Sequence, residues 1–378
     1  MRVLVITNYL GNFGGLGRYS YEVVKALRAQ STEVDVLSEA PQPKEKFEYN
    51  QLRPVFGQKK TTLMKNLLHN LATTRRIAKD YDVIHAHDGW PYGVYGWYAT
   101  LGTKKRLFVT GIGTYSVAPL KEKVRGVLLR LAYKRAAGIF CISEYVLKRL
   151  RETGPYTRAR VVFMGTTELP KVPADRIAEL SKKFSVGEKY PIIVSVGDVK
   201  HRKGQLDTLK SLHLLKDAYP HFLYVIIGDD SDVYYVGRIK SYIKEFHLED
   251  NVLIISKMYD DKILSFFYTI CDLVMLNSNN EQDHFEGFGL VLLEAAQFGK
   301  PTIGSRGCGI ESAISDGYNG YLANQGDHDD IAAKVRRIVE KDAAAFGPHA
   351  LEFYKRFLWE KTAREYLRDY GKSQWGVV

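Results

Sequence analysis

The sequence predicts an α/β protein with two doubly wound domains, each built on a parallel sheet. Short apolar stretches alternate with helical stretches along the whole chain, which is typical of βαβ units. The alternation breaks once, around residues 168–173, where two prolines within four residues indicate a linker. A length of 378 residues also suits two domains. Two such domains in tandem are expected to face each other across a cleft that holds the ligand.

The first domain is expected over residues 1–169. It opens with a strand, a glycine-rich loop at residues 11–17, and a helix that carries Tyr19, Val23 and Leu27 on one face. Helical stretches separate most of the strands that follow. The predicted strands are residues 3–6, 34–37, 83–86, 107–109, 139–142 and 161–163.

The second domain is expected over residues 170–359, where the alternation restarts. The last helical stretch runs from about residue 359 to residue 370. The predicted strands of this domain are residues 192–196, 222–227, 252–255, 273–276, 302–303 and 320–322.

The composition excludes several classes of protein. Hydrophobic residues make up 45% and charged residues 26% of the chain, which argues against a disordered or fibrous protein. No apolar stretch approaches the ~18 residues of a membrane-spanning helix, and the apolar run at residues 3–6 is too short for the core of a signal peptide. The three cysteines are widely separated, which excludes a disulfide framework and a cysteine zinc site. We therefore expect a cytoplasmic protein.

Positive charge is concentrated in the first half of the chain. Residues 1–170 contain 27 Lys and Arg against 13 Asp and Glu, whereas the whole chain contains 54 against 43. One interpretation is a solvated surface that aids solubility. The other is that the first half faces an anionic partner, such as phosphate, nucleic acid or a membrane surface.

The glycine-rich loop reads GNFGGLG and directly follows a strand. Backbone amides in such loops approach phosphates closely because no side chain intervenes. The spacing differs from the G-x-G-x-x-G fingerprint of dinucleotide-binding folds, and Asp35 lies within the second strand rather than at the place of the ribose-binding acid. A nicotinamide site is therefore disfavoured, and a tight turn alone is the other interpretation.

The strongest local pattern is EGFGLVLLE at residues 286–294. A helix is expected to begin near Gly289, so that the amides of Gly289 and Leu290 form a site for an anion. Glu286 precedes the helix, and Glu294 lies five residues into it, about 7.5 Å along its axis. The two carboxylates flank a site of phosphate size and can accept hydrogen bonds from vicinal hydroxyls. The alternative is that Glu294 is a solvent-exposed helix residue.

A second pattern is GDVKHRKG at residues 197–204, between a strand and a helix. Lys200, Arg202 and Lys203 crowd this loop, and like charges gathered at one point attract an anion unless the loop is simply solvated. Together with the glutamate pair, this loop predicts a site for a nucleotide diphosphate.

These motifs together resemble family 4 of the glycosyltransferases, which has the B-type glycosyltransferase fold of two Rossmann-like domains. The resemblance covers essentially the whole chain. In that fold the final helix returns to the first domain, so residues from about 360 to 378 are expected to pack there. The motifs that carry the resemblance are residues 14–18, 82–87, Ser143, residues 202–204, 286–294, 299–301 and 316–322, and Trp359.

The resemblance implies retaining transfer from a UDP- or GDP-sugar. Lys203 would hold the diphosphate and neutralise the leaving group, and Glu286 would bind hydroxyls of the donor sugar. The resemblance also implies that these charges replace the divalent metal used by other sugar transferases, and no cofactor is expected. The implied catalytic residues are Glu286, Lys203 and His87, and the implied donor-binding residues are Gly15, Gly197, Arg202, Lys203, Phe288, Gly289, Leu290 and, at the ribose, Glu294.

Two positions depart from the family pattern. The phosphate loop carries Asp198 where the family often has Arg, so either Lys200 or Arg202 substitutes or the diphosphate is held less firmly. Ile112 stands where the family often has a His that contacts the donor sugar. His87 is the candidate to replace it, although His87 could equally be an ordinary hydrogen-bonded residue at a strand end.

Two stretches, residues 59–79 and 121–135, interleave basic and apolar residues. Such helices can lie on anionic membranes, but their apolar faces could equally pack on the sheet. The first domain of the family usually takes the acceptor, and many acceptors are lipid-linked. We therefore expect a saccharide or lipid-linked acceptor, no nucleic acid, and a peripheral enzyme on the inner face of the cell membrane that contacts it through Lys121, Lys123 and Arg125. Cell-envelope polysaccharide or glycolipid synthesis is the expected setting.

Two other functions remain open at this point. A nucleotide-sugar 2-epimerase shares the fold but needs acid–base carboxylates in the cleft, and the motif at residues 286–294 argues against it. A non-catalytic homologue that binds sugar nucleotides is motivated by Ile112 and Asp198.

Overall fold

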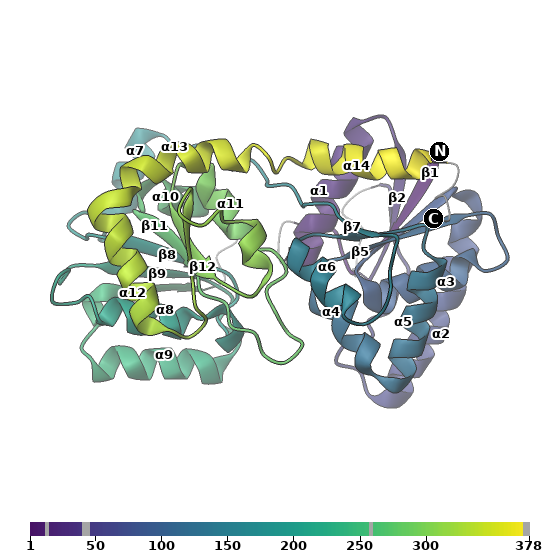
Figure 1. Ribbon diagram of the computed structural model, residues 1–378, viewed down its shortest axis with the longest axis horizontal. Coiled ribbons are helices and arrows are strands. Elements are labelled where there is room, and N and C mark those ends of the chain that lie inside the picture. Colours follow the sequence, from purple (N-terminus) through teal and green to yellow (C-terminus); the bar gives the residue numbers. More distant parts are fainter. Residues whose placement is uncertain (12–14, 40–45, 257–259, 373–378) are drawn as a thin grey trace. The chain divides into compact units, whose positions relative to one another are not determined.

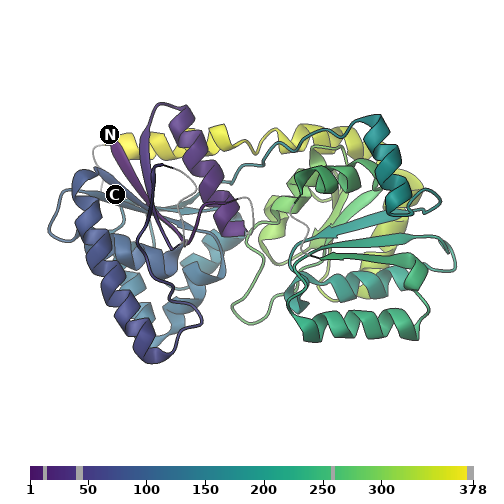
Figure 2. The same ribbon diagram turned by 180° about the vertical axis from the view of Figure 1, so that it is seen from behind.

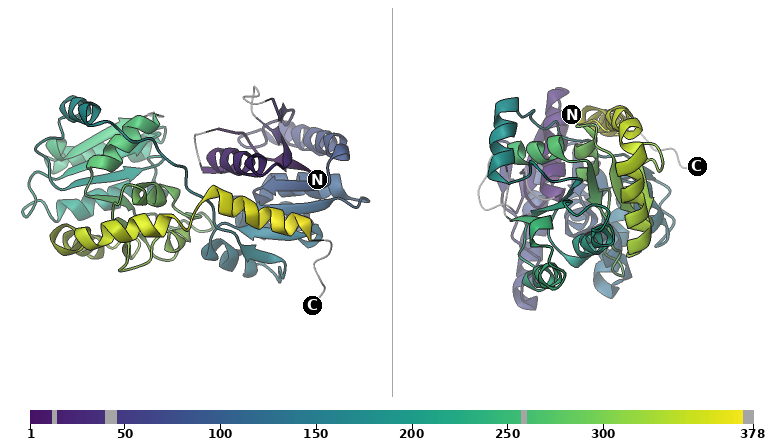
Figure 3. Two further views of the ribbon diagram at one scale, coloured as in Figure 1. Left: turned by 90° about the horizontal axis from the view of Figure 1, so that it is seen from above. Right: turned by 90° about the vertical axis from the view of Figure 1, so that its left-hand side faces the viewer.

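The computed structural model describes residues 1–11, 15–39, 46–256 and 260–372, and the chain divides into two compact units (Figure 1). Unit 1 consists of Met1–Gly165 and Leu358–Val378, and unit 2 is Thr166–Phe357. Each unit is a parallel sheet with helices on both faces, as the views from behind and from above also show (Figures 2 and 3). The predicted fold class, two doubly wound α/β domains, is confirmed.

The sheet of unit 1 has seven strands in the order β3-β2-β1-β4-β5-β6-β7, and every neighbouring pair is parallel. Its strands are β1 (Arg2–Ile6), β2 (Glu33–Ser38), β3 (Glu48–Asn50), β4 (Val83–His87), β5 (Arg106–Gly111), β6 (Gly138–Cys141) and β7 (Ala159–Val161). Its helices are α1 (Gly15–Ala29), α2 (Lys60–Ile77), α3 (Val94–Thr100), α4 (Thr114–Val117), α5 (Lys123–Arg135), α6 (Glu144–Arg151) and α14 (Trp359–Gly371).

The sheet of unit 2 has six strands in the order β10-β9-β8-β11-β12-β13, again all parallel. Its strands are β8 (Ile192–Val196), β9 (Leu223–Gly228), β10 (Val252–Ser256), β11 (Leu273–Leu276), β12 (Thr302–Ser305) and β13 (Gly320–Ala323). Its helices are α7 (Ala174–Lys183), α8 (Gln205–His213), α9 (Val233–Glu245), α10 (Asp261–Ile270), α11 (Leu290–Ala296), α12 (His328–Arg337) and α13 (Ala343–Tyr354), with a short 3₁₀ turn, η4 (His201–Lys203), ahead of α8.

Every strand predicted from the sequence is present within two residues of its predicted bounds. The sequence does not predict β3, which has only three residues and pairs with β2 at the edge of the sheet. Glu48 and Asn50 are polar, so this strand lacks the apolar run by which the others are recognised.

The first unit ends at Gly165, four residues before the expected end of the first domain at residue 169. Thr166 belongs to unit 2 because its amide donates to the carbonyl of Phe357 at 2.9 Å. The side chain of Gln297 also donates to the carbonyl of Thr167 at 2.6 Å and accepts from the amide of Leu169 at 3.1 Å. The two prolines therefore follow the junction and do not mark it.

The closing helix α14 packs on α1 and completes the core of unit 1. The hydroxyl of Tyr366 lies 2.6 Å from that of Tyr19, and the hydroxyl of Tyr370 lies 2.6 Å from His85 Nδ1. All four side chains are fully buried. The two ends of the described chain thus share one hydrogen-bonded core.

Candidate functional site

The predicted site residues of unit 2 lie at the carboxyl edge of its sheet, where the strand order reverses. β8 lies between β9 and β11. From β8 the chain continues to β9 on one side, and from β11 it continues to β12 on the other side, so the strand order reverses between β8 and β11. Doubly wound sheets bind ligands at the carboxyl ends of strands at such a reversal. The loop after β8 carries Arg202 and Lys203, and the loop after β11 carries Glu286.

The structure brings these three residues together in one ion-pair cluster. Glu286 Oε2 accepts from Lys203 Nζ at 2.6 Å and from Arg202 Nη1 at 3.1 Å. The side chains are largely buried, with exposures of 14% for Glu286, 15% for Lys203 and 19% for Arg202. Both cations therefore share one carboxylate oxygen in a weakly hydrated place, where charge interactions are strong.

The two cations keep Glu286 ionised. Burial alone would raise the pKa of this carboxyl, but Lys203 and Arg202 outweigh the burial and hold the pKa at about 2. Glu286 is thus an anion at any pH at which the protein is expected to work.

The backbone on both sides of the cluster is held by the fold. The amide of Gly309 donates to the carbonyl of Glu286 at 2.8 Å, and a Cβ on Gly309 would lie only 1.9 Å from the carbonyl oxygen of Gly287. Across the cluster, the amide of Asn279 donates to the carbonyl of Arg202 at 2.8 Å. The charged side chains consequently project from rigid backbone.

Glu294 lies on α11, one residue from the middle of this short helix, and only 1% of it is exposed. Its Oε2 accepts from the hydroxyl of Tyr268 at 3.3 Å. The alternative of a solvent-exposed helix residue is therefore wrong. Gly289 is the N-cap and Leu290 the first residue of α11, as predicted, but the helix has only seven residues. We accordingly assign positive charge at this site to Lys203 and Arg202 rather than to a helix dipole.

The side chain of Phe288 points into unit 2, where its ring packs on Phe357 with 5.7 Å between centroids. Gly197 closes β8, and its amide donates to the carbonyl of Ile227 at 2.9 Å. In the same loop, Lys200 Nζ pairs with Asp198 Oδ2 at 2.7 Å. Of the two candidates to replace the usual arginine, Arg202 is thus the one that accompanies Lys203.

His87 lies at the end of β4 and is fully buried. Its Nδ1 lies 2.9 Å from the hydroxyl of Ser20, its Nε2 has no partner among the described residues, and burial lowers its pKa to about 3. This environment matches the interpretation of an ordinary residue at a strand end. Contact with a donor sugar would require its neighbours to move, and its catalytic role stays a prediction.

Two acids at the carboxyl edge of the unit 1 sheet are not singled out by the sequence. Asp88 directly follows β4 and accepts from the amide of Gly89 at 2.8 Å and from the hydroxyl of Ser116; burial raises its pKa to about 6. Glu39 directly follows β2 and accepts from the hydroxyl of Tyr92 at 3.0 Å; burial raises its pKa to about 7. Their positions right after strands, in a half of the chain that is poor in acids, are the signal that could have found them.

Gly15 is the first residue of α1, whereas Gly14 of the predicted motif lies outside the described residues. Among the described atoms, nothing lies within 4 Å of a Cβ built on Gly15. A Cβ on Gly17, by contrast, would lie 2.3 Å from the ring of Tyr9. A side chain at Gly17 would therefore require the ring of Tyr9 to move, whereas one at Gly15 would meet no described atom.

The two basic stretches form α2 and α5, and both present apolar side chains to the outside. Helix α2 turns polar residues inward: the side chain of Asn66 donates to the carbonyl of Pro54 at 2.7 Å, and that of Asn70 to the carbonyl of Arg53 at 2.9 Å. The exposed apolar residues of the two helices are Met64 (55%), Leu68 (61%), Val124 (72%), Val127 (52%) and Leu131 (40%). Their apolar faces are thus not fully packed on the sheet.

The predicted basic contacts lie at the start of α5. Lys121 and Lys123 are exposed. Arg125 is engaged within the unit, because it pairs with Glu122 at 3.2 Å and its guanidinium lies 5.4 Å from the centroid of the Trp90 ring. None of the described helices is long and apolar enough to cross a membrane.

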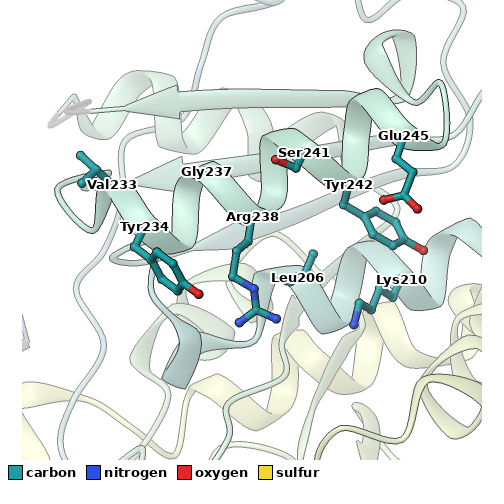
Figure 4. Close-up of a pocket in the computed structure, with 9 residues that line it drawn as sticks. All are labelled: Leu206, Lys210, Val233, Tyr234, Gly237, Arg238, Ser241, Tyr242 and Glu245. Atoms are coloured by element: carbon teal, nitrogen blue, oxygen red, sulfur yellow. The ribbon is translucent and has the colours of Figure 1, made fainter.

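A hollow of about 550 Å³ lies between α8 and α9 of unit 2 (Figure 4). Its lining includes Lys210, Tyr234, Arg238 and Tyr242, and no residue of the predicted donor site contributes to it. Over the described ranges there is also no group of three or more His, Cys, Asp or Glu side chains that could hold a metal ion. The charged cluster around Glu286 therefore remains the candidate site.

Comparison with known proteins shows the family to which the chain belongs. A family described as glycosyltransferase family 4 matches residues 13–166, and one described as glycosyl transferases group 1 matches residues 176–356. An uncharacterized glycosyltransferase of Methanocaldococcus jannaschii, MJ1178, is 26% identical over 373 residues, which cover 96% of this chain and 95% of the relative. The N-acetyl-alpha-D-glucosaminyl L-malate synthase of Bacillus anthracis is 24% identical over 80% of this chain and 79% of its own.

Among solved structures, Anabaena Alr3699/HepE in complex with UDP and glucose has a TM-score of 0.79 at 20% identity, covering 97% of this chain and 98% of its own. This likeness extends over both units and identifies the B-type glycosyltransferase fold. With the family matches on both units and the charged cluster at the strand-order reversal of the second, the chain belongs to family 4 of the glycosyltransferases and is a retaining enzyme that uses nucleotide-sugar donors.

Proposed function

We propose that the enzyme transfers a sugar from a UDP- or GDP-sugar to a saccharide or lipid-linked acceptor at an anionic membrane surface. The expected setting is the synthesis of cell-envelope polysaccharide or glycolipid. The cluster of Glu286, Lys203 and Arg202 carries the donor part of this proposal. UDP as the nucleotide is supported by the Anabaena relative, whose structure contains UDP and glucose.

The roles of the donor-site residues follow from their chemistry. Lys203 and Arg202 neutralise the diphosphate, and charge-assisted hydrogen bonds of this kind are strong in a partly buried site. Glu294 accepts hydrogen bonds from the ribose hydroxyls, and Glu286 accepts them from the hydroxyls of the donor sugar. Gly15 offers a backbone amide with no side chain in the way.

The chemical step needs no nucleophile from the protein. The bond between the anomeric carbon and the phosphate oxygen breaks, and the acceptor oxygen bonds to the same face of that carbon, which retains the configuration. The proton of the acceptor hydroxyl passes to the departing phosphate oxygen. Lys203 and Arg202 stabilise the charge that develops there, and for this reason we expect the reaction to proceed without a divalent metal.

The membrane part of the proposal is supported by the outer faces of α2 and α5. Exposed Val124 and Val127 lie beside exposed Lys121 and Lys123, and exposed Met64 lies beside Lys65. Apolar side chains flanked by lysines suit the interface of an anionic bilayer. The acceptor is assigned to unit 1, which carries these helices.

A donor screen tests the proposal. The purified enzyme is incubated with labelled UDP- and GDP-sugars, with and without chelator, alone or with lipid extract. We expect slow donor hydrolysis alone and transfer with a suitable acceptor, both insensitive to chelator. Release of a free 2-epimer would instead show an isomerase, and absence of binding by thermal shift for every donor would contradict the proposal.

A further inference from the structure

The ion-pair cluster has a consequence for the order in which phosphate and sugar are recognised. Both cations assigned to the diphosphate bind the carboxylate of Glu286, at 2.6 Å from Lys203 and 3.1 Å from Arg202. A carboxylate oxygen and a phosphate oxygen offer the same kind of acceptor to these groups. Lys203 and Arg202 each have further N–H donors, but a diphosphate that binds them must compete with Glu286 for their charge.

We propose that Glu286 is a tethered substitute for the donor phosphate, and that this makes the site discriminate between a sugar nucleotide and a bare nucleoside diphosphate. The inference rests on the proposed function, in which Lys203 and Arg202 hold the diphosphate. Glu286 competes with every diphosphate for the two cations. The loss of its ion pairs is compensated only when the diphosphate carries a sugar.

The compensation follows from what the displaced carboxylate can contact. Breaking the pair leaves a largely buried anion without its cations, which is unfavourable. When the ligand is a sugar nucleotide, the hydroxyls of the sugar donate to the displaced carboxylate. When the ligand is a bare nucleoside diphosphate, no hydroxyl takes their place, and the carboxylate lies near the added negative charge of the terminal phosphate. The product of transfer is thus bound less tightly than the cations alone would bind it.

The backbone geometry allows this exchange without movement of the loop. The carbonyl of Glu286 stays bonded to the amide of Gly309 at 2.8 Å, and Gly287 packs directly on Gly309. Rotation about the side-chain bonds of Glu286 is then sufficient to move its carboxylate from the cations to a sugar. The backbone that carries the two cations is also held, because the Arg202 carbonyl accepts from the amide of Asn279 and the Lys203 amide donates to the carbonyl of Lys200.

A purely structural ion pair makes the opposite prediction. If Glu286 served only to hold Lys203 and Arg202 in position, its removal would loosen both cations and weaken every diphosphate ligand. If Glu286 competes, its removal frees the cations and strengthens the binding of ligands that carry no sugar.

Titration calorimetry of Glu286→Gln separates the two cases. The variant keeps the shape of the side chain and removes the charge. We expect it to bind UDP and inorganic pyrophosphate about five- to tenfold more tightly than the parent protein, and the sugar nucleotide more weakly. The gain should shrink at high salt, since it arises from two uncompensated cations. Glu281→Gln is the matched control, because Glu281 lies on the same loop but pairs with His201, and its affinities should not change.

Unchanged or weaker binding of both UDP and pyrophosphate by folded Glu286→Gln would overturn the inference. If this variant does not fold, Glu286→Asp takes its place: it withdraws the carboxylate by one methylene and should give a smaller gain in the same direction. Pyrophosphate distinguishes the two proposals. If no nucleotide binds but pyrophosphate binds more tightly to the variant, the proposed donor fails while the competition stands; if pyrophosphate binds neither protein, the competition fails as well.

Discussion

The loops that follow β1 and β8 occupy the same place in their sheets but differ in charge. Each strand is the third in its sheet order, beside the reversal. The loop after β8 contains three Lys or Arg residues, although acids slightly exceed bases in that half of the chain. Residues 7–17, after β1, contain no Lys or Arg, although their half of the chain has 27 Lys and Arg against 13 Asp and Glu. The net charge of a domain therefore does not locate its site.

The difference shows that the two kinds of positive charge act over different ranges. In unit 2, Lys203 and Arg202 are largely buried beside one carboxylate, and the role we propose for them requires direct contact with the ligand. In unit 1, the carboxyl edge of the sheet carries the acids Glu39 and Asp88, and the lysines lie on exposed helices. Exposed lysines act through solvent over about a Debye length, ~8 Å at physiological salt.

Removing the buried charge of unit 2 should have the largest consequence for activity. Lys203→Ala should lower kcat by about 10²–10³-fold, because charge on the leaving phosphate loses a contact that counts most in the transition state. Lys200→Ala removes the same charge from the same loop. Because Lys200 pairs with Asp198, this variant should lose little activity. Steady-state kinetics with one donor checks both variants, and equal losses would mean that the loop acts only as a diffuse positive patch.

The second prediction separates nucleotide from sugar. Glu294→Ala should weaken UDP binding about tenfold or more, because hydrogen bonds to a charged group are worth roughly 1.5–3 kcal/mol. Tyr268→Phe removes the hydrogen bond that Tyr268 donates to Glu294 but keeps the carboxylate, so this variant should bind UDP nearly as the parent does. Calorimetry with UDP measures the affinity of both variants. Similar losses of affinity in the two would show that Glu294 supports the packing of the core and does not bind the ribose.

The third prediction concerns the exposed charge of unit 1. Reversing Lys121 and Lys123 to Glu should weaken binding to anionic vesicles about tenfold or more, at ~1 kcal/mol per charge, and leave UDP binding intact. Reversing Lys182 and Lys183 on α7 of unit 2 changes the net charge equally and should have less effect. Co-sedimentation at low and high salt is the measurement. Equal binding to neutral and anionic vesicles would show that the lysines serve another purpose.

The fourth prediction compares two glycines of one helix. Gly15→Ala should fold normally, since no described atom lies within 4 Å of the new Cβ. If the Gly15 amide approaches the diphosphate, the variant should nevertheless bind the sugar nucleotide severalfold more weakly. Gly17→Ala should instead lower the melting temperature, because its Cβ would meet the ring of Tyr9 at 2.3 Å. Thermal unfolding with and without donor separates them, and a Gly15 variant with full donor affinity would remove this loop from the site.

The smallest expected effect is the pH dependence that Glu39 introduces. Its pKa is raised from 4.5 to about 7 by burial, so the folded protein favours the protonated acid. The contribution of Glu39 to stability is fully present below pH 4.5 and falls as the pH rises from 4.5 to 7. Above pH 7 this contribution stays at its lower value. Glu39→Gln cannot ionise and should raise the unfolding free energy at pH 8 by about 1 kcal/mol, a value discounted for partial exposure. Denaturant unfolding of the parent and the variant at pH 5 and pH 8 checks this, with exposed Glu33→Gln on β2, the strand that precedes Glu39, as the control. A Glu39→Gln variant whose stability relative to the parent is the same at both pH values would contradict it.

The sequence predicts the strands well because buried parallel strands are short apolar runs, and it misses β3 because Glu48 and Asn50 are not apolar. It also brings Lys203 and Glu286 to one edge of a sheet, because each follows a strand. It does not predict that two cations share one oxygen of Glu286, since that depends on side-chain reach between loops 83 residues apart.

The orientation of α2 is equally invisible to the sequence. Its spacing of Leu and Met residues suggests that an apolar face packs inward, but Asn66 and Asn70 face inward instead, because they bond to the backbone of Pro54 and Arg53. Likewise, the buried Nδ1 of His87 finds its partner in Ser20, 67 residues away. Such partners are specified by the fold as a whole and not by local periodicity.

The position of α14 has a consequence for synthesis. Unit 1 needs Tyr366 and Tyr370 to cover Tyr19 and His85, and the backbone of Trp359 lies so close to Gly165 that a Cβ there would be 2.3 Å from its amide nitrogen. The ~200 residues between Gly165 and Gly371 take about 10–40 s to translate at ~5–20 residues per second. Unit 2 is continuous in the chain, so its core can form before that of unit 1, although its synthesis begins later. Until α14 has been made, Tyr19 and His85 of unit 1 lack the cover of Tyr366 and Tyr370.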